Sequence, residues 1–592
     1  MRSAALARGI ARVSALLPIP LDIVQRAGTR LEATGDLALA RNCFRRAFKR
    51  APQRELSRWG LASTLSTIAL RDNDLDAFLE ALPHLGALGD SNIWGMRATA
   101  RLATLLAHTG YYTDALPHYE RLLRGHAETP ALSVEYAEAL AKLGRRTEAL
   151  EQIPYSATVS TDAALRAVRL EVLAGRFDSA AERLNRLERQ TPADAIRIDE
   201  ERVLLLARAG RLADALALRA RVSGFRRIFT SDAGRSAEGG VMITVVCWGV
   251  RACDSLLDMC LPSQLVESQI PAVGTEPDLV YRLYTSDADA DRLLSHPSLH
   301  ALAALVRTEV IAFPSRVLQA ARSKYEAANW CHQHAVLDAN LKGRSLVFIS
   351  PDSVIAAGGL VWLLSERKRG TRTILISGPR VTKETALPAI AKMADKGTLH
   401  GARTLRISPR SLVNVVLDHP HHSMMGGFVD AGYVNDFWSC LFSRVGSSGL
   451  LARQMHLHPL MVTPDVLTAI PEQTVDSLFV GEACTEVDGV RVVEDSDEFC
   501  AISWSARGEN TAMRKYPERS RRKAALIAHL ARRHVAPFNL GLLRHRIRFH
   551  TEDLGPEWMQ AERTSDTIVA EVIELLSEPS LAVRASDGVV MK

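Results

Sequence analysis

The sequence predicts an all-α helical repeat domain followed by a mostly parallel α/β domain. From about residue 21 to residue 222, apolar residues recur at the i, i+3, i+4 and i+7 spacing of amphipathic helices, with short breaks at Gly or Asp. After residue 240, β-branched runs alternate with helical stretches. That alternation is typical of parallel strands whose two faces are both covered by helices.

Length and composition limit the possible function. The 592 residues suffice for about four domains of roughly 150 residues each, unless a repeat array takes up much of the length. With 47% hydrophobic and 24% charged residues, the composition is that of an ordinary globular protein, which excludes fibrous and disordered classes. The net charge of +6 is too small over this length to indicate a nucleic-acid partner.

The cysteines and the apolar runs indicate the compartment. The eight cysteines form no C-x-x-C pair, so neither a zinc knuckle nor a disulfide framework is predicted, and a reducing cytoplasm fits best. No run of about 18 apolar residues is present, so we expect no membrane span. An alternative for residues 1–17, which contain Arg2, Arg8 and Arg12 and no acid, is an organelle transit peptide.

The helical half repeats itself with a period of about 35 residues. Alanines in similar segments recur at spacings of 37, 38, 34, 31 and 35 residues: Ala40, Ala77, Ala115, Ala149, Ala180 and Ala215. A period of this length indicates helical hairpins that stack into a solenoid, because one hairpin cannot bury its own apolar face. We place this domain at residues 1–225.

One repeat is especially regular: Gly28, Leu31, Gly35, Ala40, Phe44, Ala47 and Pro52. Its order and spacing resemble a tetratricopeptide repeat (TPR), with a tight turn at Gly35, and later units place Gly110, Gly144, Gly175 and Gly210 in phase. The unit around Asp72 lacks the turn glycine. The resemblance implies a concave surface that binds a partner polypeptide. The alternative is an array that only packs on the rest of the chain or dimerises.

The remainder of the chain divides into a linker, an α/β domain and a basic tail. Residues 226–240 lose the helical spacing and gain Gly, Ser and charge, which marks a linker. Within residues 241–510 we expect strands at Val241–Trp248, Leu279–Thr285, Thr308–Phe313, Ser345–Ile349 and Arg372–Ser377, separated by helices. Residues 511–592 are predicted to form a basic, helical C-terminal segment.

Several familiar catalytic motifs are absent from the α/β half. It has no G-x-G-x-x-G after the first strand and no G-x-x-x-x-G-K-[ST], which disfavours a dinucleotide or P-loop site. It also lacks G-x-S-x-G and H-E-x-x-H, which disfavours the common hydrolases and zinc proteases.

The segment 324–354, KYEAANWCHQHAVLDANLKGRSLVFISPDSV, resembles the sugar-nucleotide core of GT-A-type glycosyltransferases. In that family a Lys/Asn-bearing helix precedes a strand that ends in Asp-x-Asp; here Ser350 and Asp352 take the two acidic places. The resemblance implies that Asp352 holds a divalent metal, Mg²⁺ or Mn²⁺, against a nucleotide diphosphate, although the missing first acid puts metal dependence in doubt. The alternative is a turn that caps the next helix.

The same resemblance assigns further donor-binding residues: Trp248, Gly249, Arg251, Lys324, Asn329 and Ser350. Trp248 could equally be a core residue. His456 and His458 alternate in a strand-like segment, and His458 is the predicted second metal ligand; the alternative is a structural role. Asp287, Asp289 and Asp291 look like another Asp-x-Asp but fit the acidic first turn of a helix better.

The acceptor side departs from the family pattern. Residues 446–453 resemble the segment in which inverting members carry an acidic pair, but Ser447 and Ser448 stand in its place. A serine is no general base at neutral pH without help, so another carboxylate would have to act. We favour Asp436 as the catalytic residue over Asp476 and the group Asp495, Asp497 and Glu498.

Residues 514–550 contain eleven Arg and Lys and one acid, Glu518. Such a cluster would bind an anion: a nucleotide diphosphate, an acidic acceptor, a peripheral membrane surface or RNA. Aromatic residues are sparse there, which disfavours nucleic acid. The alternative is a solvated helix face.

Two classes of function follow. The first is a glycosyltransferase that moves a sugar from a nucleotide-diphosphate donor to a protein or glycan acceptor recruited by the array. The second is a non-catalytic TPR interaction scaffold whose glycosyltransferase-like domain has lost its chemistry, which the replaced acids favour.

Overall fold

The computed structural model describes residues 2–13, 19–125, 130–153, 160–187, 192–233, 239–274, 276, 278–464, 469–472, 475, 477–484, 489–511, 513–518, 522–578 and 580–581. The chain forms two compact units. The first comprises residues 1–174, 518–534 and 571–592, and the second comprises residues 175–517 and 535–570.

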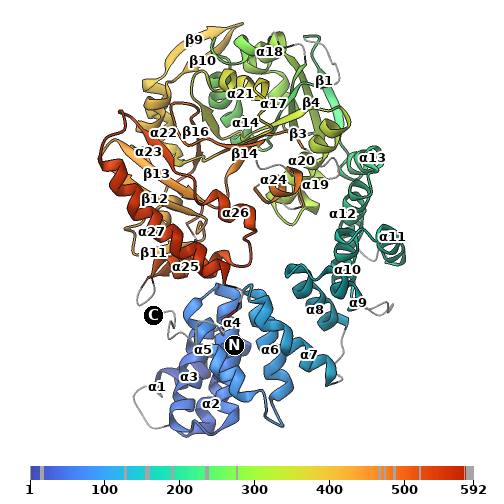
Figure 1. Ribbon diagram of the computed structural model, residues 1–592, viewed down its shortest axis with the longest axis vertical. Helices are drawn as coiled ribbons and strands as arrows, with labels where there is room; N and C mark the ends of the chain where they lie inside the picture. Colours follow the sequence, from blue (N-terminus) through green and yellow to red (C-terminus); the bar gives the residue numbers. More distant parts are fainter. Residues whose placement is uncertain are drawn as a thin grey trace. The chain divides into compact units, whose positions relative to one another are not determined.

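The first unit is a stack of helices, as the sequence predicts (Figure 1). Consecutive helices pack on each other, and the pairs α2–α3, α4–α5, α6–α7 and α8–α9 form hairpins. Its helices are α1 (Arg2–Val13), α2 (Leu21–Ala33), α3 (Leu37–Arg50), α4 (Glu55–Asp72), α5 (Leu75–Leu88), α6 (Gly95–His108), α7 (Tyr112–Arg124), α8 (Pro130–Lys142), α9 (Arg146–Glu151), α10 (Thr161–Leu173) and α25 (Lys523–Ala531).

The turns of the hairpins are confirmed by their backbone conformation. All five predicted turn glycines have a positive φ, between 76° and 87°: Gly35, Gly110, Gly144, Gly175 and Gly210. Side chains rarely adopt this conformation, which explains the recurring glycine. In the irregular unit, Asn73 takes the left-handed conformation instead, with φ 48°. Asn tolerates this region better than most residues, so the hairpin forms without glycine.

Glycines also allow the helices of the first hairpins to approach closely. Phe44 of α3 is buried, and a Cβ added at Gly28 of α2 would lie 2.9 Å from its ring. A Cβ at Gly60 of α4 would lie 2.8 Å from Phe44 Cζ and nearer still to the adjacent ring atoms. The ring therefore fills the space between two glycine backbones, as the small residues of the repeat predict.

The basic cluster of residues 514–550 is largely paired inside the molecule. In the first unit, Arg522 contacts Glu571 at 2.9 Å and Lys523 contacts Glu518 at 3.2 Å. Arg532 lies 4.4 Å from the centre of the Tyr111 ring. In the second unit, the acids of α27 (Glu557–Ser577) bind two more arginines of the cluster: Arg546 contacts Asp566 at 2.7 Å, and Arg548 contacts Glu562 at 2.7 Å. These pairs replace the predicted external anion at those positions; Arg519 and Arg521 lie outside the described residues.

The second unit is built on an eight-stranded sheet with the order β1-β4-β3-β2-β5-β14-β7-β15. β2, β3, β4 and β5 run parallel, β14 is antiparallel to both β5 and β7, and β1 is antiparallel to β4. The strands are β1 (Arg226–Thr230), β2 (Val241–Val246), β3 (Leu279–Ser286), β4 (Arg307–Phe313), β5 (Ser345–Ile349), β7 (Thr373–Ile376), β14 (His458–Val462) and β15 (Val490–Val492).

Smaller sheets and helices complete this unit. The sheets are β9 (Asp395–Leu399) with β10 (Ala402–Arg406); β11 (Tyr433–Asn435) with β17 (Lys515–Pro517); β12 (Cys440–Val445), β13 (Gly449–Gln454) and β18 (Ile547–His550); and β6 (Ser353–Ile355), β16 (Ala501–Ser505) and β8 (Arg380–Thr382). The helices are α11 (Phe177–Arg186), α12 (Pro192–Arg208), α13 (Leu212–Ser223), α14 (Val250–Ser255), η1 (Leu256–Cys260), α15 (Leu261–Gln264), α16 (Ile270–Val273), α17 (Ala290–Leu294), α18 (Pro297–Leu305), α19 (Ser315–Ala320), α20 (Lys324–Leu341), α21 (Gly359–Lys368), α22 (Lys383–Met393), α23 (Pro409–Asp418), η2 (His422–Gly427), α24 (Ser477–Ala483), α26 (Pro537–Leu542) and α27.

The five predicted strands are confirmed as β2, β3, β4, β5 and β7. Both faces of these strands are buried, because alternate residues join different cores: Met242 packs with α12, α13 and α20, whereas Ile243 packs with helices α14 to α18 and α21. The predicted linker, residues 226–240, contains a strand, because β1 pairs with the edge of the sheet through β4. The helices α11 to α13, predicted as the end of the array, belong to this unit.

The last hairpin packs on the sheet unit through an unusual buried charge. Arg219 of α13 is fully buried and lies 5.8 Å from the ring of Trp330 on α20. Trp330 Nε1 donates a hydrogen bond to Glu200 of α12. Burial lowers the pKa of Arg219 to about 10 and raises that of Glu200.

None of the described helices combines the length and the apolar character needed to cross a bilayer.

Candidate functional site

A cavity of about 580 Å³ lies in the second unit. Its walls come from β5, β7 and β14 of the large sheet, from α20, and from β8, β12 and β16 of the smaller sheets. Cavities of this size are typical of small-molecule sites. Sequence reasoning places Ser350 and His458 at a site, and both line this cavity.

The connectivity of the sheet explains why a cavity forms there. From β2 the chain proceeds outward on one side to β3 and β4, and β5 then pairs with the other side of β2. Loops after β2 and β5 therefore leave in different directions and open a crevice at the carboxyl ends of the strands, the usual ligand position in such sheets. Gly249 follows β2, and Ser350 and Asp352 follow β5.

Ser350, Asp352 and His458 lie close together at this edge. Ser350 Oγ donates a hydrogen bond to Asp352 Oδ1, and His458 Nε2 lies 2.9 Å from the carbonyl oxygen of Phe348. The ring of His458 is open to the cavity, but surrounding protein desolvates it and lowers the pKa of its imidazole, while the Asp352 carboxylate opposes this shift. The two predicted metal ligands are thus neighbours.

The donor set does not fit Mg²⁺ or Mn²⁺. These ions prefer several oxygen ligands, usually carboxylates. Asp352 already accepts a hydrogen bond from Ser350, and among the described residues that line the cavity there is neither an Asp nor a Glu. One carboxylate and one imidazole would leave most positions of the metal to water or substrate, so we derive no step through a metal.

The other predicted donor-binding residues lie outside the cavity lining. Trp248 packs edge-on against Phe313, with ring centres 5.7 Å apart, in agreement with the core alternative. Gly249 is exposed and its N–H donates to Asp289 Oδ2 at 2.7 Å, while Arg251 is exposed on α14. Asp289 therefore supports the start of α14. Of the three acids predicted in the first turn of a helix, Asp291 lies in the first turn of α17, Asp289 is its N-cap residue and Asp287 precedes the helix.

The two predicted residues of α20 have separate environments. Lys324 is exposed, and its Nζ lies 5.2 Å from the centre of the Tyr325 ring; of these two residues, Tyr325 lines the cavity and Lys324 does not. Asn329 is buried, and its Nδ2 donates to the carbonyl of Pro471 at 3.2 Å. Asn329 therefore holds a neighbouring segment.

Asp436, the predicted catalytic carboxylate, is exposed and does not line the cavity. Its Oδ2 accepts from the Arg514 N–H at 2.9 Å and its Oδ1 from the Tyr516 hydroxyl at 3.0 Å. Both oxygens thus join β11 to β17. Ser447 and Ser448 form the turn of the β12–β13 hairpin, and Asp476 lies outside the described residues.

Sequence reasoning missed several residues of the cavity: His332, Arg380, Cys440, Phe437 and Phe442. They come from α20, β8, β12 and the segment just before β12, and no short motif connects these elements. The one local signal was the H-x-H pattern of α20, in which His332 lies one turn beyond Ala328, another lining residue. Burial lowers the pKa of His332 to about 4.

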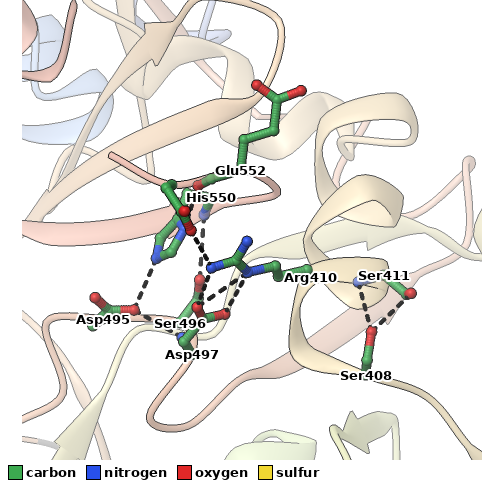
Figure 2. Close-up of polar contacts among 9 residues, drawn as sticks. Ser408, Arg410, Ser411, Asp495, Ser496, Asp497, His550 and Glu552 are labelled. Carbon is green, nitrogen blue, oxygen red and sulfur yellow. Dashed lines mark hydrogen bonds and ion pairs between the residues drawn. The ribbon is translucent and has the colours of Figure 1, made fainter. Parts of the chain in front are cut away.

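A second polar cluster contains Asp495, Asp497 and His550 (Figure 2). Arg410 binds Asp497 through two nitrogens at 2.9 and 3.1 Å, and these hydrogen bonds raise the pKa of Arg410. His550 Nε2 lies 2.9 Å from Asp495 Oδ1, and its Nδ1 lies 2.7 Å from the carbonyl oxygen of Glu552. Both ring nitrogens of His550 and the carboxylate of Asp497 therefore already have partners. The cluster is a structural contact that joins α23, β18 and the loop that precedes β16.

The first unit carries a different candidate surface. Exposed apolar side chains recur near the start of three neighbouring helices, at Ile23 of α2, Leu56 of α4 and Met96 of α6. Just before α6, Ile93 is 75% exposed. The rings of Trp59 and Trp94 stack with centres 5.0 Å apart. We name these six residues the hairpin-end surface.

Polar contacts connect the starts of these helices. Arg54 contacts Asp22 at 2.9 Å, which joins α4 to α2, and Ser91 donates to Glu55 at 2.7 Å, which joins the approach to α6 with α4. Farther along, Ser63 donates to Glu32 at 2.9 Å and Arg101 to Ser66 at 2.7 Å. The first helices of successive hairpins are therefore held side by side.

No protein-family model matches the chain, and no curated protein matches it. Among matching solved structures, a tetratricopeptide repeat protein from Parabacteroides merdae is 21% identical over 34% of this chain and 78% of its own, with a TM-score of 0.30. YrrB, a TPR protein with an unusual peptide-binding site, is 18% identical over 28% of this chain and 82% of its own, with a TM-score of 0.23. A thermophilic TPR protein in Thermus thermophilus is 22% identical over 33% of this chain and 100% of its own, also with a TM-score of 0.23.

Proposed function

We propose that this chain is a TPR-like interaction scaffold whose hairpin-end surface binds a segment of a partner polypeptide. The observation that carries the proposal is the recurrence of exposed apolar side chains at equivalent places on α2, α4 and α6: Ile23 is 42% exposed, Leu56 50% and Met96 43%. Single exposed apolar residues are common, but a contiguous set is typical of an interaction surface.

The surface suits an extended or helical segment of a partner. Its apolar residues follow the stacking direction of the hairpins, because α2 packs on α4 and α4 packs on α6. Arg97 lies 5.8 Å from the centre of the Trp94 ring and places a positive charge at its border. A partner with spaced aliphatic or aromatic residues and an acidic residue nearby would match both features.

The chemistry of the cavity supports a scaffold that does not catalyse sugar transfer. A glycosyl transfer needs a base or a group that neutralises the diphosphate. Asp352 is bound by Ser350, and Asp436 by Arg514 and Tyr516. Neither carboxylate lines the cavity, so neither stands in the arrangement that the family resemblance requires.

The test is a selection of peptides that bind the full chain, followed by measurement of Kd for the best one. Leu56→Asp and Met96→Asp should weaken binding at least tenfold, because each places a charge in the contact. Met393→Asp is the matched control, since Met393 is 41% exposed on α22 of the other unit. Equal Kd values for Met96→Asp and Met393→Asp would exclude this surface.

A second candidate function is nucleotide-sugar-dependent transfer, with the donor in the crevice between β2 and β5. The observation that favours it is the change of chain direction at β2, with Ser350 and Asp352 at the adjacent strand end. Thermal stabilisation by one nucleotide-diphosphate sugar that is lost in Asp352→Ala would support donor binding. Release of free sugar from that donor would then support catalysis, and no shift with any donor would exclude this candidate.

A further inference from the structure

The cavity of the second unit has an uneven distribution of charge. Its walls are mainly apolar and aromatic, with Tyr325, Phe348, Phe437 and Phe442 among them. Of the described residues that line it, Arg380 is the one with a permanent charge, and none is acidic. Such a site disfavours cations and has one fixed position for an anion.

Arg380 lacks a counter-ion in the part of the chain that the structure describes. It lies at the start of β8 and is half-buried, and its Nη1 donates to Ser505 Oγ at 3.1 Å. No carboxylate of the described residues forms an ion pair with it. A partly desolvated guanidinium with one neutral partner retains donors that a carboxylate or phosphate would bind in a forked geometry.

The other polar residues of the cavity are neutral near pH 7. Burial lowers the pKa of His332 to about 4 and also lowers the pKa of His456 and His458. Burial raises the pKa of the Cys440 thiol, so it adds no competing negative charge. The cavity therefore combines one cation, uncharged polar groups and a large apolar wall.

We propose that this cavity binds an amphipathic anion, with a carboxylate or phosphate head on Arg380 and an apolar body along the aromatic wall. The volume of about 580 Å³ accommodates a small molecule with a chain or ring system. This binding needs no metal and is independent of the hairpin-end surface, so it stands or falls separately from the scaffold proposal.

The experiment compares decanoate, decyl phosphate and decanol as probes below their aggregation limits, by calorimetric titration of the full chain. The two anions should bind at least tenfold more tightly than decanol. Arg380→Gln should weaken the binding of both anions by roughly ten- to a hundredfold, which is the strength of a charge-assisted hydrogen bond. It should leave the Kd of decanol unchanged. Which anion binds more tightly identifies the head group as carboxylate or phosphate.

Three variants guard against a folding artefact. Arg403→Gln, at an exposed position of β10, removes a positive charge outside the cavity and should change nothing. Arg380→Lys should keep part of the preference for anions. Ser503→Phe, which fills the cavity, should abolish binding of all three probes with the circular dichroism spectrum unchanged. Equal binding of decanol and decanoate, a preference that survives Arg380→Gln, or no binding of any probe would each overturn the proposal.

Discussion

The close packing of the first hairpins predicts a large effect for Gly60→Ala. The new Cβ would lie 2.8 Å from Phe44 Cζ and nearer still to two other ring atoms, whereas carbon atoms prefer about 3.5–4.0 Å. The ring has little room to move, because it is also close to Gly28, where an added Cβ would lie 2.9 Å from it. Overpacking of this kind costs about 1–3 kcal/mol, and the tight site places the cost near 3 kcal/mol, of which the preference of Ala over Gly in a helix returns up to about 1 kcal/mol. For a unit of this size, a net loss of about 2–3 kcal/mol lowers Tm by about 4–12 °C.

The assay is the thermal unfolding of the full chain, measured by calorimetry. Gly86→Ala is the matched control, because Gly86 also lies in a helix, α5, but has nothing within 4 Å of an added Cβ. Its Tm should stay the same or rise, since Ala favours a helix by up to about 1 kcal/mol over Gly. Phe44→Leu should relieve part of the penalty of Gly60→Ala. Equal Tm values for the two single glycine variants would refute the packing argument.

Two further predictions concern buried charges. Replacing the charged pair by Glu200→Gln with Arg219→Met should raise stability by about 1–4 kcal/mol, since the amide still accepts from Trp330; a lower Tm in calorimetry would contradict it. Burial opposes ionisation of Asp338, but the charge of Arg282 holds the pKa of Asp338 at about 2. The ionised Asp338 therefore contributes about 2 kcal/mol to the free energy of unfolding above pH 4, and this contribution is lost as the pH falls from about 4 to 2. Asp338→Asn should lower stability at pH 7 by about 2 kcal/mol, because Arg282 keeps its ion pair with Glu309 at 2.6 Å, and it should flatten the urea-unfolding profile in that acid range; an unchanged profile would contradict this.

The local features of the fold were predictable because their signals lie within short segments. A glycine such as Gly35 or Gly110 is needed wherever the backbone takes a positive φ, so its recurrence reveals the hairpins. The run Ser345–Ile349 is apolar on both faces because helices cover both sides of β5. The strand β1 was missed because its exposed, charged residues have no apolar alternation.

The candidate site was predictable only in part. Ser350 was found because it follows an apolar strand in a segment that resembles a known family, and His458 because it alternates with His456 in a strand-like segment; the structure brings both residues to one edge of the sheet. Arg380 and Cys440 come from strands of different sheets, and their shared cavity depends on packing between distant segments. The environment of Asp436 likewise depends on Tyr516, a residue 80 positions away, which no local pattern could connect.

Hydrogen exchange of the full chain, with and without the selected peptide at saturation, tests the scaffold proposal most directly. The account predicts slower exchange at the starts of α2, α4 and α6, which carry Ile23, Leu56 and Met96. Exchange in the second unit should not change. Protection confined to residues 241–510, or none in either unit, would contradict it.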